Sequence, residues 1–392
     1  MSDVIQFKPR PRGKAVEKMA AEAAGQRVAA IDILRGLCVA GMILVAYAGD
    51  WSHRFKVLNH ADWHGLALAD MIFPGFLLCA GMAIPLSLAK RGEDKGKIAL
   101  HIAWRAAALI VLGIVLNFLA TPDIARFRIP GILQRIGLCY GLAGALALVL
   151  ARREGKGLRV PILPVAGAMA GVLIVYGAIL MASGHFDATS SLPAVIDRAV
   201  FTTHYMWPYG TTNGQVTYDP EGLLSTLGAL GNVLLGVAVA AYMRRVGVKA
   251  SLATLAFVAL LLFVLGAGLD GNLPIIKKIW TPSFTLLSGG FTLPVFVLLA
   301  VIADVAGWTA WAVPLRVLGA NATAAFAAIS LIDIVMKLPL GSGRIGHDVL
   351  VKALDSVIPD VRLESLAYSA ILLAVVLLAL TPLYIKRWYL KF

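Results

Sequence analysis

Long runs of apolar residues recur along almost the whole chain, separated by short polar segments. A helix needs about 20 predominantly apolar residues to cross the hydrocarbon core of a bilayer. Ten runs meet this requirement, and we expect each to form a membrane span: 29–49, 66–89, 98–119, 130–150, 160–183, 222–243, 250–269, 283–306, 313–336 and 364–385. The pattern predicts an all-α polytopic membrane protein, a bundle of ten transmembrane helices.

Composition supports this class. Of the 392 residues, 59% are hydrophobic and only 15% are charged, which excludes a soluble globular domain. Residues 1–28 are polar and basic and predict a cytoplasmic tail, and residues 29–392 predict a single transmembrane domain. No signal peptide is recognisable at the start, so we expect the first span to serve as its own insertion signal.

The basic residues alternate between loops. They gather before the first span, in alternate loops at 90–97, 152–159 and 244–249, and after the last span at 386–391. The positive-inside rule places these segments, and both termini, in the cytoplasm. The remaining loops lie outside, and the longest is 184–221. The net charge of +13 is explained by this bias and by anionic lipid, so we expect no nucleic-acid partner.

Polar and titratable residues gather at the start of the second span. His60, Asp62, Trp63, His64 and Asp70 lie there within eleven positions. Ionisable groups that enter a bilayer are costly and mostly serve chemistry or a polar path, which singles out Asp70. A histidine in such a loop is either a solvated side chain or a proton-transfer group, whose near-neutral pKa suits it to that task.

Two further pairs are ambiguous. Asp32 and Arg35 share one helix face, either as an ion pair that anchors the inner end of the first span or as a binding site for an anionic ligand. Asp219 and Glu221 flank the start of the sixth span, where they either stabilise the helix dipole or bind a ligand. Their loop is rich in aromatic and hydrogen-bonding residues, which suits a sugar or an interfacial belt.

The cysteines and the paired glycines indicate packing and no catalytic or metal-binding role. Cys38, Cys79 and Cys139 all fall within predicted spans and are read as buried hydrophobic residues. Gly137 and Gly141 predict close helix packing. No metal-ligand spacing is present, so we expect no metal.

Six short motifs occur in order along residues 30–392, and together they resemble the heparan-alpha-glucosaminide N-acetyltransferase family, which comprises lysosomal membrane enzymes and their bacterial relatives. They are Asp32-Ile33-Leu34-Arg35-Gly36-Leu37, His60-Ala61-Asp62-Trp63-His64-Gly65-Leu66 with Ala69 to Pro74, Ile132-Leu133-Gln134-Arg135-Ile136-Gly137, Tyr218 to Leu224, Pro274 to Ser283, and Gly319-Ala320-Asn321.

The resemblance implies transfer of an acetyl group from cytoplasmic acetyl-CoA to an amino sugar, of glucosamine type, on the far side of the membrane. The active-site histidine of the family matches His60, which we expect to be the base or the acetyl carrier, with Asp70 orienting it. Acceptor binding is expected from Asp62, Trp63, Gln134, Arg135, Asp219, Glu221 and Asn321. Asp32 and Arg35 would face the CoA end. The resemblance also suggests a homodimer in the bacterial inner membrane.

One departure from the family stands out. Relatives carry an asparagine just after the first span, where this chain reads Val45-Ala46-Tyr47-Ala48-Gly49. If that asparagine polarises the acetyl carbonyl or positions the acceptor, activity or acceptor differs here.

Two alternative functions remain open. O-acetylation of an envelope polysaccharide would need the same donor and base, with a hydroxyl as nucleophile. A solute transporter would also fit ten spans with intramembrane Asp and Arg.

Overall fold

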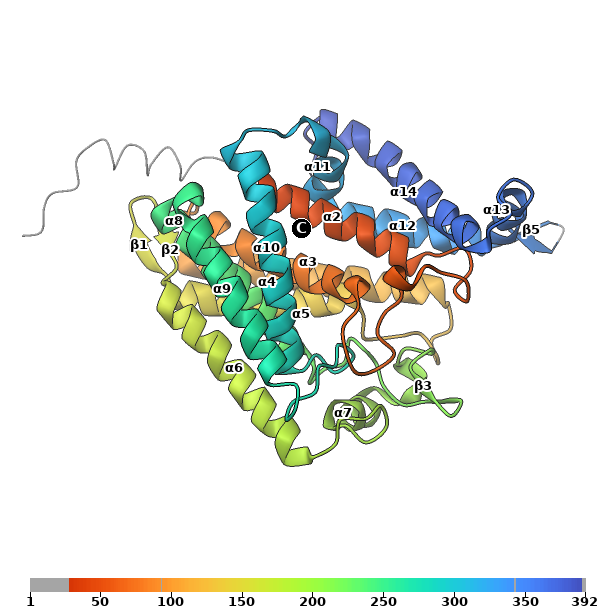
Figure 1. Cartoon of the computed structure of the whole chain (residues 1–392), viewed down its shortest axis with the longest axis horizontal. Coiled ribbons are helices and arrows are strands. Elements are labelled where there is room, and N and C mark those ends of the chain that lie inside the picture. The colour runs from red at the N-terminus through yellow and green to blue at the C-terminus, as the bar shows by residue number, and fades with distance from the viewer. Residues whose placement is uncertain (1–27, 93, 342, 390–392) are drawn as a thin grey trace, which may run out of the picture.

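The computed structural model describes residues 28–92, 94–341 and 343–389, and it shows a bundle of long helices (Figure 1). Nine described helical segments are long and apolar enough to cross a membrane. They are α2 (Ala29–Ala46), Leu68–Leu88 with α3 (Ile72–Leu88), α4 (Lys95–Ala120), α5 (Ile132–Leu150), α6 (Ile162–Ser183), α8 (Thr226–Val246), α9 (Val248–Gly268), Pro282–Val305 with α10 (Pro282–Ala300), and α14 (Val361–Ile385). The predicted fold class is confirmed, and these nine segments match nine of the ten predicted spans to within a few residues.

The ninth predicted span, 313–336, is not one continuous helix. It consists of α11 (Val313–Ala320), extended by a 3₁₀ turn at Ala310–Ala312, and α12 (Ala322–Met336), which meet at an angle of 75°. Asn321 lies at the break with a non-helical backbone (φ −124°, ψ 41°). The two helices together count as a tenth, broken span at the predicted position, and the break at Asn321 was not predicted.

Close backbone approaches hold the centre of the bundle together. A Cβ atom added at Gly81 of α3 would lie 1.9 Å from the carbonyl oxygen of Val233 in α8. A Cβ atom at Gly137 of α5 would lie 2.7 Å from the carbonyl oxygen of Ala106 in α4. Only glycine permits contacts this short, so the predicted role of Gly137 in close helix packing is confirmed. Cys38, Cys79 and Cys139 are free and buried, as predicted.

The two ends of the bundle differ. At one end the hairpin β1 (Arg152–Glu154) and β2 (Gly157–Arg159) joins α5 to α6. At the other end, the loop after α6 contains α7 (Leu192–Phe201) and the hairpin β3 (Thr211–Thr212) and β4 (Gln215–Val216) (Figure 1). A third hairpin, β5 (Pro339–Leu340) and β6 (Arg344–Ile345), precedes α13 (Gly346–Asp355). The end that carries α7 also carries His60, and the predicted basic tail 1–28 lies almost wholly outside the described residues.

The inner end of α2 is fixed by a residue from the other half of the chain. The Asp304 carboxylate accepts hydrogen bonds from the backbone N–H groups of Ala29 (2.7 Å) and Ala30 (3.0 Å). The first N–H groups of a helix lack partners within the helix, and a carboxylate beside them satisfies them and favours the helix dipole. The Asp304 contact therefore caps α2 and positions its first turn, including Asp32.

Candidate active site

His60 and Asp70 form a hydrogen-bonded pair at the start of the second span. His60 Nδ1 lies 2.8 Å from Asp70 Oδ1, and the backbone N–H groups of Ala61 (3.2 Å) and Ala67 (2.9 Å) donate to Asp70 Oδ2. An ionised carboxylate only accepts, so the proton of the histidine bond lies on Nδ1. The Nε2 lone pair is thereby left available, which is the arrangement that a general base requires.

The buried carboxylate distinguishes His60 from the two other histidines nearby. His53 contacts Asp50 at 2.8 Å and His64 contacts Asp270 at 2.9 Å, but these carboxylates are 37% and 36% exposed. The Asp70 side chain is only 1% exposed. Because solvent weakens the first two pairs, only His60 has a strongly held partner, and this supports the choice of His60 over His53 and His64.

Lys277 joins this pair from the loop between α9 and α10. Its Nζ lies 3.1 Å from Asp70 Oδ1 and 2.9 Å from His60 Nδ1. Burial lowers the pKa of His60, and Lys277 and Arg54 lower it further, while the hydrogen bond to Asp70 acts in the opposite direction. Lys277 was not among the site residues expected from the sequence, although the motif from Pro274 to Ser283 contains it.

An aromatic surface lies next to His60. The rings of Trp63 and Tyr218 meet edge to face with centroids 5.0 Å apart, and Lys278 Nζ lies 5.6 Å from the first ring and 5.4 Å from the second. Trp63 Nε1 donates to the carbonyl oxygen of Phe186 at 2.7 Å, and Lys278 donates to that of Asp62. The structure thus places Asp62 and Trp63 beside Tyr218, near the end of the loop 184–221.

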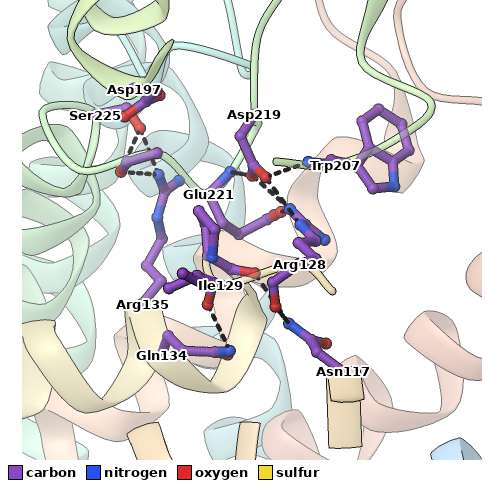
Figure 2. Close-up of polar contacts among 12 residues, drawn as sticks. Asn117, Arg128, Ile129, Gln134, Arg135, Asp197, Trp207, Asp219, Glu221 and Ser225 are labelled. Carbon is purple, nitrogen blue, oxygen red and sulfur yellow. Dashed lines mark hydrogen bonds and ion pairs between the residues drawn. The ribbon is translucent and has the colours of Figure 1, made fainter. Parts of the chain in front are cut away.

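Asp219 and Glu221 are engaged by Arg128, which was not among the site residues expected from the sequence (Figure 2). Arg128 Nη2 lies 2.5 Å from Asp219 Oδ1, its Nε donates to Asp219 Oδ2 at 2.9 Å, and Nη2 also contacts Glu221. One interpretation of these two acids was that they stabilise the dipole at the start of the sixth span. That interpretation was wrong, because α8 begins only at Thr226, after both residues. Their main contact is this ion-pair cluster.

Gln134 and Arg135 open α5 and point toward different neighbours (Figure 2). Gln134 Nε2 donates to the carbonyl oxygen of Ile129 at 2.9 Å and so fixes the turn into α5. Arg135 Nη2 donates to the carbonyl oxygen of Gly222 at 2.9 Å and to Ser225 Oγ, and its guanidinium lies 5.1 Å from the Trp280 ring centroid. Arg135 is 1% exposed, and its Nε and Nη1 have no hydrogen-bond partner among the described residues. Arg135 therefore has spare donors and Gln134 supports the backbone.

A buried carboxyl, Asp197 of α7, lies next to this cluster. Its Oδ1 accepts a hydrogen bond from the backbone N–H of Leu223 at 2.8 Å. Burial raises the pKa of Asp197 to about 7, and the neighbouring Asp219 adds to the effect. Asp197 is therefore largely protonated at mildly acidic pH, unlike an exposed aspartate.

Replacing Asp197 by asparagine is expected to remove a pH dependence of stability. Because the folded-state pKa is raised above the unfolded value, the contribution of Asp197 to stability is fully present below about pH 4 and is lost as pH rises through about 7. The loss is on the order of 4 kcal/mol. Thermal unfolding of wild type and Asp197→Asn in detergent across this range measures it, and parallel curves for the two proteins would contradict the assignment.

A cavity of about 610 Å³ runs along α3 from its inner end nearly to Asp70. This volume is within the range of small-molecule sites. Its wall holds Asp32 and Arg35, whose side chains form an ion pair at 3.2 Å, so the pair forms and also faces a possible ligand. The basic residues and tyrosines of the wall are Arg35, Lys90, Arg91, His101, Arg105, Tyr140, Arg244 and Tyr389.

The basic wall offers unused donors. The Nε groups of Arg35, Arg105 and Arg244 are buried without a hydrogen-bond partner among the described residues. Guanidinium groups pair well with phosphate, so these three side chains could hold a phosphorylated ligand.

The cavity stops short of His60. Ile72 and Phe73, which close its outer end, follow Asp70 by two and three residues, and the Phe73 ring meets Trp280 edge to face at 5.2 Å. His60 is not among the lining residues. Along α3, the lining of the basic cavity therefore ends at Ile72 and Phe73, just short of Asp70, and we refer to these two residues as the partition between the cavity and the His60 pair.

Asn321 lies away from the other expected acceptor-binding residues. Its neighbours Ala320 and Ala322 line the cavity together with Asp32, and a Cβ at Gly319 would lie 1.9 Å from the carbonyl oxygen of Asp32. The structure thus places Asn321 at the level of Asp32, at the inner end of α2, far along the bundle from His60.

The segment that departs from the family has its own contacts. Tyr47 Oη lies 3.3 Å from Ser330 Oγ, and the Gly49 N–H donates to the carbonyl oxygen of Ser365 at 3.3 Å. These contacts connect the segment to α12 and α14, and its residues, Val45 to Gly49, include no amide side chain.

Among the described residues, no group of three or more His, Cys, Asp or Glu side chains is placed to hold a metal ion. The expectation of a metal-free protein stays a prediction.

Comparison with known proteins identifies relatives of this chain. A family model described as "Heparan-alpha-glucosaminide N-acetyltransferase, catalytic" matches residues 27–268. The chain is 27% identical over 334 residues to human heparan-alpha-glucosaminide N-acetyltransferase, covering 72% of this chain and 50% of the human protein. The mouse protein of the same name is 27% identical over 335 residues with the same coverage. The chain thus spans about half the length of the curated relatives it matches.

Proposed function

Because the chain belongs to the heparan-alpha-glucosaminide N-acetyltransferase family, we propose that it is a transmembrane acetyltransferase. It transfers the acetyl group of cytoplasmic acetyl-CoA to the amine of a glucosamine-type sugar outside. The observation that carries this proposal is the pairing of two features along α3: the His60–Asp70 pair at its outer end, and a cavity with unpaired arginine donors that extends from its inner end.

We propose that acetyl-CoA binds in the basic cavity, which its volume and unpaired arginine donors support. Its phosphates would lie against Arg35, Arg105 and Arg244, and the pantetheine arm would follow α3 outward. Within α3, the lining residues run from Ser87 to Ile72, over which the helix advances about 22 Å at about 1.5 Å per residue, so an elongated ligand can cross most of the bilayer in this space. Asp32 would keep Arg35 oriented through their ion pair.

The chemistry centres on His60 Nε2. The sugar amine attacks the thioester carbonyl, Nε2 removes the proton that the nitrogen loses, and the CoA thiolate leaves and takes up a proton as CoA-SH. In a two-step variant the neutral imidazole attacks first, and an acetyl-imidazole then delivers the group to the amine. Arg135, with two spare donors, would stabilise the oxyanion if the partition beside Trp280 opens toward it.

The acceptor would bind beside His60. Trp63 and Tyr218 offer an aromatic surface for a sugar ring, and Asp62 is exposed next to them. Asp219 and Glu221 support this surface through Arg128, so we propose an indirect role for them. Gln134 likewise acts through the turn that it fixes, and Asn321 belongs to the donor end.

The wider setting follows the same proposal. The protein would lie in the inner membrane of a bacterium, surrounded by lipid and paired as a homodimer.

Purified protein in detergent, incubated with acetyl-CoA labelled in the acetyl group, tests the proposal. Release of CoA that depends on glucosamine, with the label recovered as an amide, is the expected result. An ester product would favour O-acetylation instead. Absence of CoA release with every amino sugar and polysaccharide tested, together with sugar flux into vesicles without acetyl-CoA, would overturn the acetyltransferase and favour a transporter.

A further inference from the structure

Lys277 completes a compact three-residue cluster that draws on separate parts of the chain. Its Nζ lies 3.1 Å from Asp70 Oδ1 and 2.9 Å from His60 Nδ1, while Nδ1 lies 2.8 Å from the same carboxylate oxygen. The Lys277 and Asp70 side chains are 16% and 1% exposed, whereas the imidazole is 39% exposed. One carboxylate oxygen thus contacts a lysine and a histidine at the same time, and the histidine is the most exposed of the three side chains.

This sharing sets the charge balance of the cluster. With neutral His60, the Lys277 ammonium and the Asp70 carboxylate balance each other. If His60 takes a second proton, two cations lie within hydrogen-bonding distance around one anion. A like charge this close disfavours the protonated imidazole.

The charged groups around the cluster do not reverse this effect. Arg54 acts on His60 in the same direction as Lys277. Glu221 stabilises the Lys277 ammonium, whereas Arg135 opposes it. Lys278 is held on the rings of Trp63 and Tyr218. Asp70 is therefore the principal group that favours a charged imidazole, and Lys277 neutralises it.

We propose that Lys277 is a positioning residue of this site: its ammonium fixes the Asp70 carboxylate against His60 Nδ1 and keeps the imidazole neutral, with Nε2 ready to accept a proton. The catalytic meaning of this inference rests on the proposed acetyltransferase function. The geometry and charge balance do not depend on that function, so the two can be tested separately.

Carbethoxylation of His60 by diethyl pyrocarbonate measures the imidazole directly, because the reagent attacks only the neutral ring. Wild type, Lys277→Met and Lys277→Arg, as full-length protein in detergent, are labelled over a range of pH, and the His60 peptide is quantified by mass spectrometry. In Lys277→Met the midpoint of the labelling profile should move to higher pH, with a several-fold slower rate at mildly acidic pH. Lys277→Arg keeps the cation and should keep the midpoint close to that of wild type.

Lys278→Met is the matched control. It removes one cation from the adjacent position of the same loop, but one that contacts Trp63, Tyr218 and the Asp62 carbonyl oxygen instead of His60. Its labelling midpoint should stay in place. Lys277→Gln is a second test variant, because it retains an N–H donor for Asp70 and loses only the charge. It should shift the midpoint as Lys277→Met does.

An unchanged or lowered midpoint in Lys277→Met and Lys277→Gln would overturn the proposal. A lysine with a purely structural role would lower the thermal unfolding temperature without moving the midpoint. If wild type releases no CoA in the transfer assay but the midpoint shifts as expected, the proposed function fails and the role of Lys277 toward His60 stands.

Discussion

Replacing His60 by alanine is expected to lower acetyl transfer by about two to four orders of magnitude, the contribution that a positioned general base usually makes. The physical reason is the loss of Nε2, because Nδ1 donates to Asp70, and the Asp70 carboxylate is in turn paired with Lys277. Steady-state release of CoA from labelled acetyl-CoA in the presence of the amino sugar measures the effect.

Binding of acetyl-CoA to the His60→Ala variant distinguishes a loss of catalysis from a loss of the folded structure. His60 does not line the basic cavity, so His60→Ala should bind acetyl-CoA as wild type does. His64→Ala is the matched control, because His64 lies in the same loop and also contacts a carboxylate, but Asp270 is exposed and outside the cluster. His64→Ala should retain transfer. Turnover near the wild-type rate in His60→Ala would remove His60 from the catalytic role.

The apolar runs were sufficient to predict most of the spans. A bilayer imposes one length requirement on every crossing, and this requirement can be counted along the sequence without knowledge of neighbouring helices. The break at Asn321 could not be found in this way. There α11 approaches α2 so closely that Gly319 contacts the backbone of Asp32, and that contact joins segments distant in sequence.

The candidate site was predicted where its members are local. His60 and Asp70 are ten residues apart at the entrance of one span, and their types alone indicated a base and its partner. Lys277 is 217 positions from His60, and no spacing rule links them. A lysine in an outer loop is usually solvated, so the motif around Pro274 was the only signal that could have selected it.

For Asp219 and Glu221, the sequence favoured a direct role in acceptor binding that the observed contacts do not require. Their loop has the composition of a sugar-binding segment, which favoured direct contact with the acceptor. Arg128, 91 positions from Asp219, accounts for both acids instead. An acidic residue cannot be assigned to a ligand from sequence when its counterion lies in an unrelated loop.

Replacing Arg128 by methionine is expected to be the most destabilising change among the charged residues considered. The Asp219 side chain is fully buried, and Arg128 itself is 19% exposed. Removing one partner of a buried ion pair leaves an uncompensated charge, which usually costs about 3–5 kcal/mol. Lys337→Met is the matched control, because Lys337 pairs with Asp333 at 2.7 Å but is 61% exposed. Loss of such a surface pair costs less than about 1 kcal/mol.

A double-mutant cycle distinguishes the ion pair from packing. Asp219→Asn removes the stranded charge and keeps a side chain that can still accept from the Trp207 N–H, which now donates to Asp219 Oδ2 at 2.8 Å. The double variant Arg128→Met with Asp219→Asn should therefore be more stable than the sum of the single changes predicts, by an amount that thermal unfolding in detergent can resolve. Additive losses would show that Arg128 contributes mainly by packing. Such a result would also mean that the ion pair with Arg128 does not account for Asp219, and direct binding of the acceptor by Asp219 would then be the better explanation.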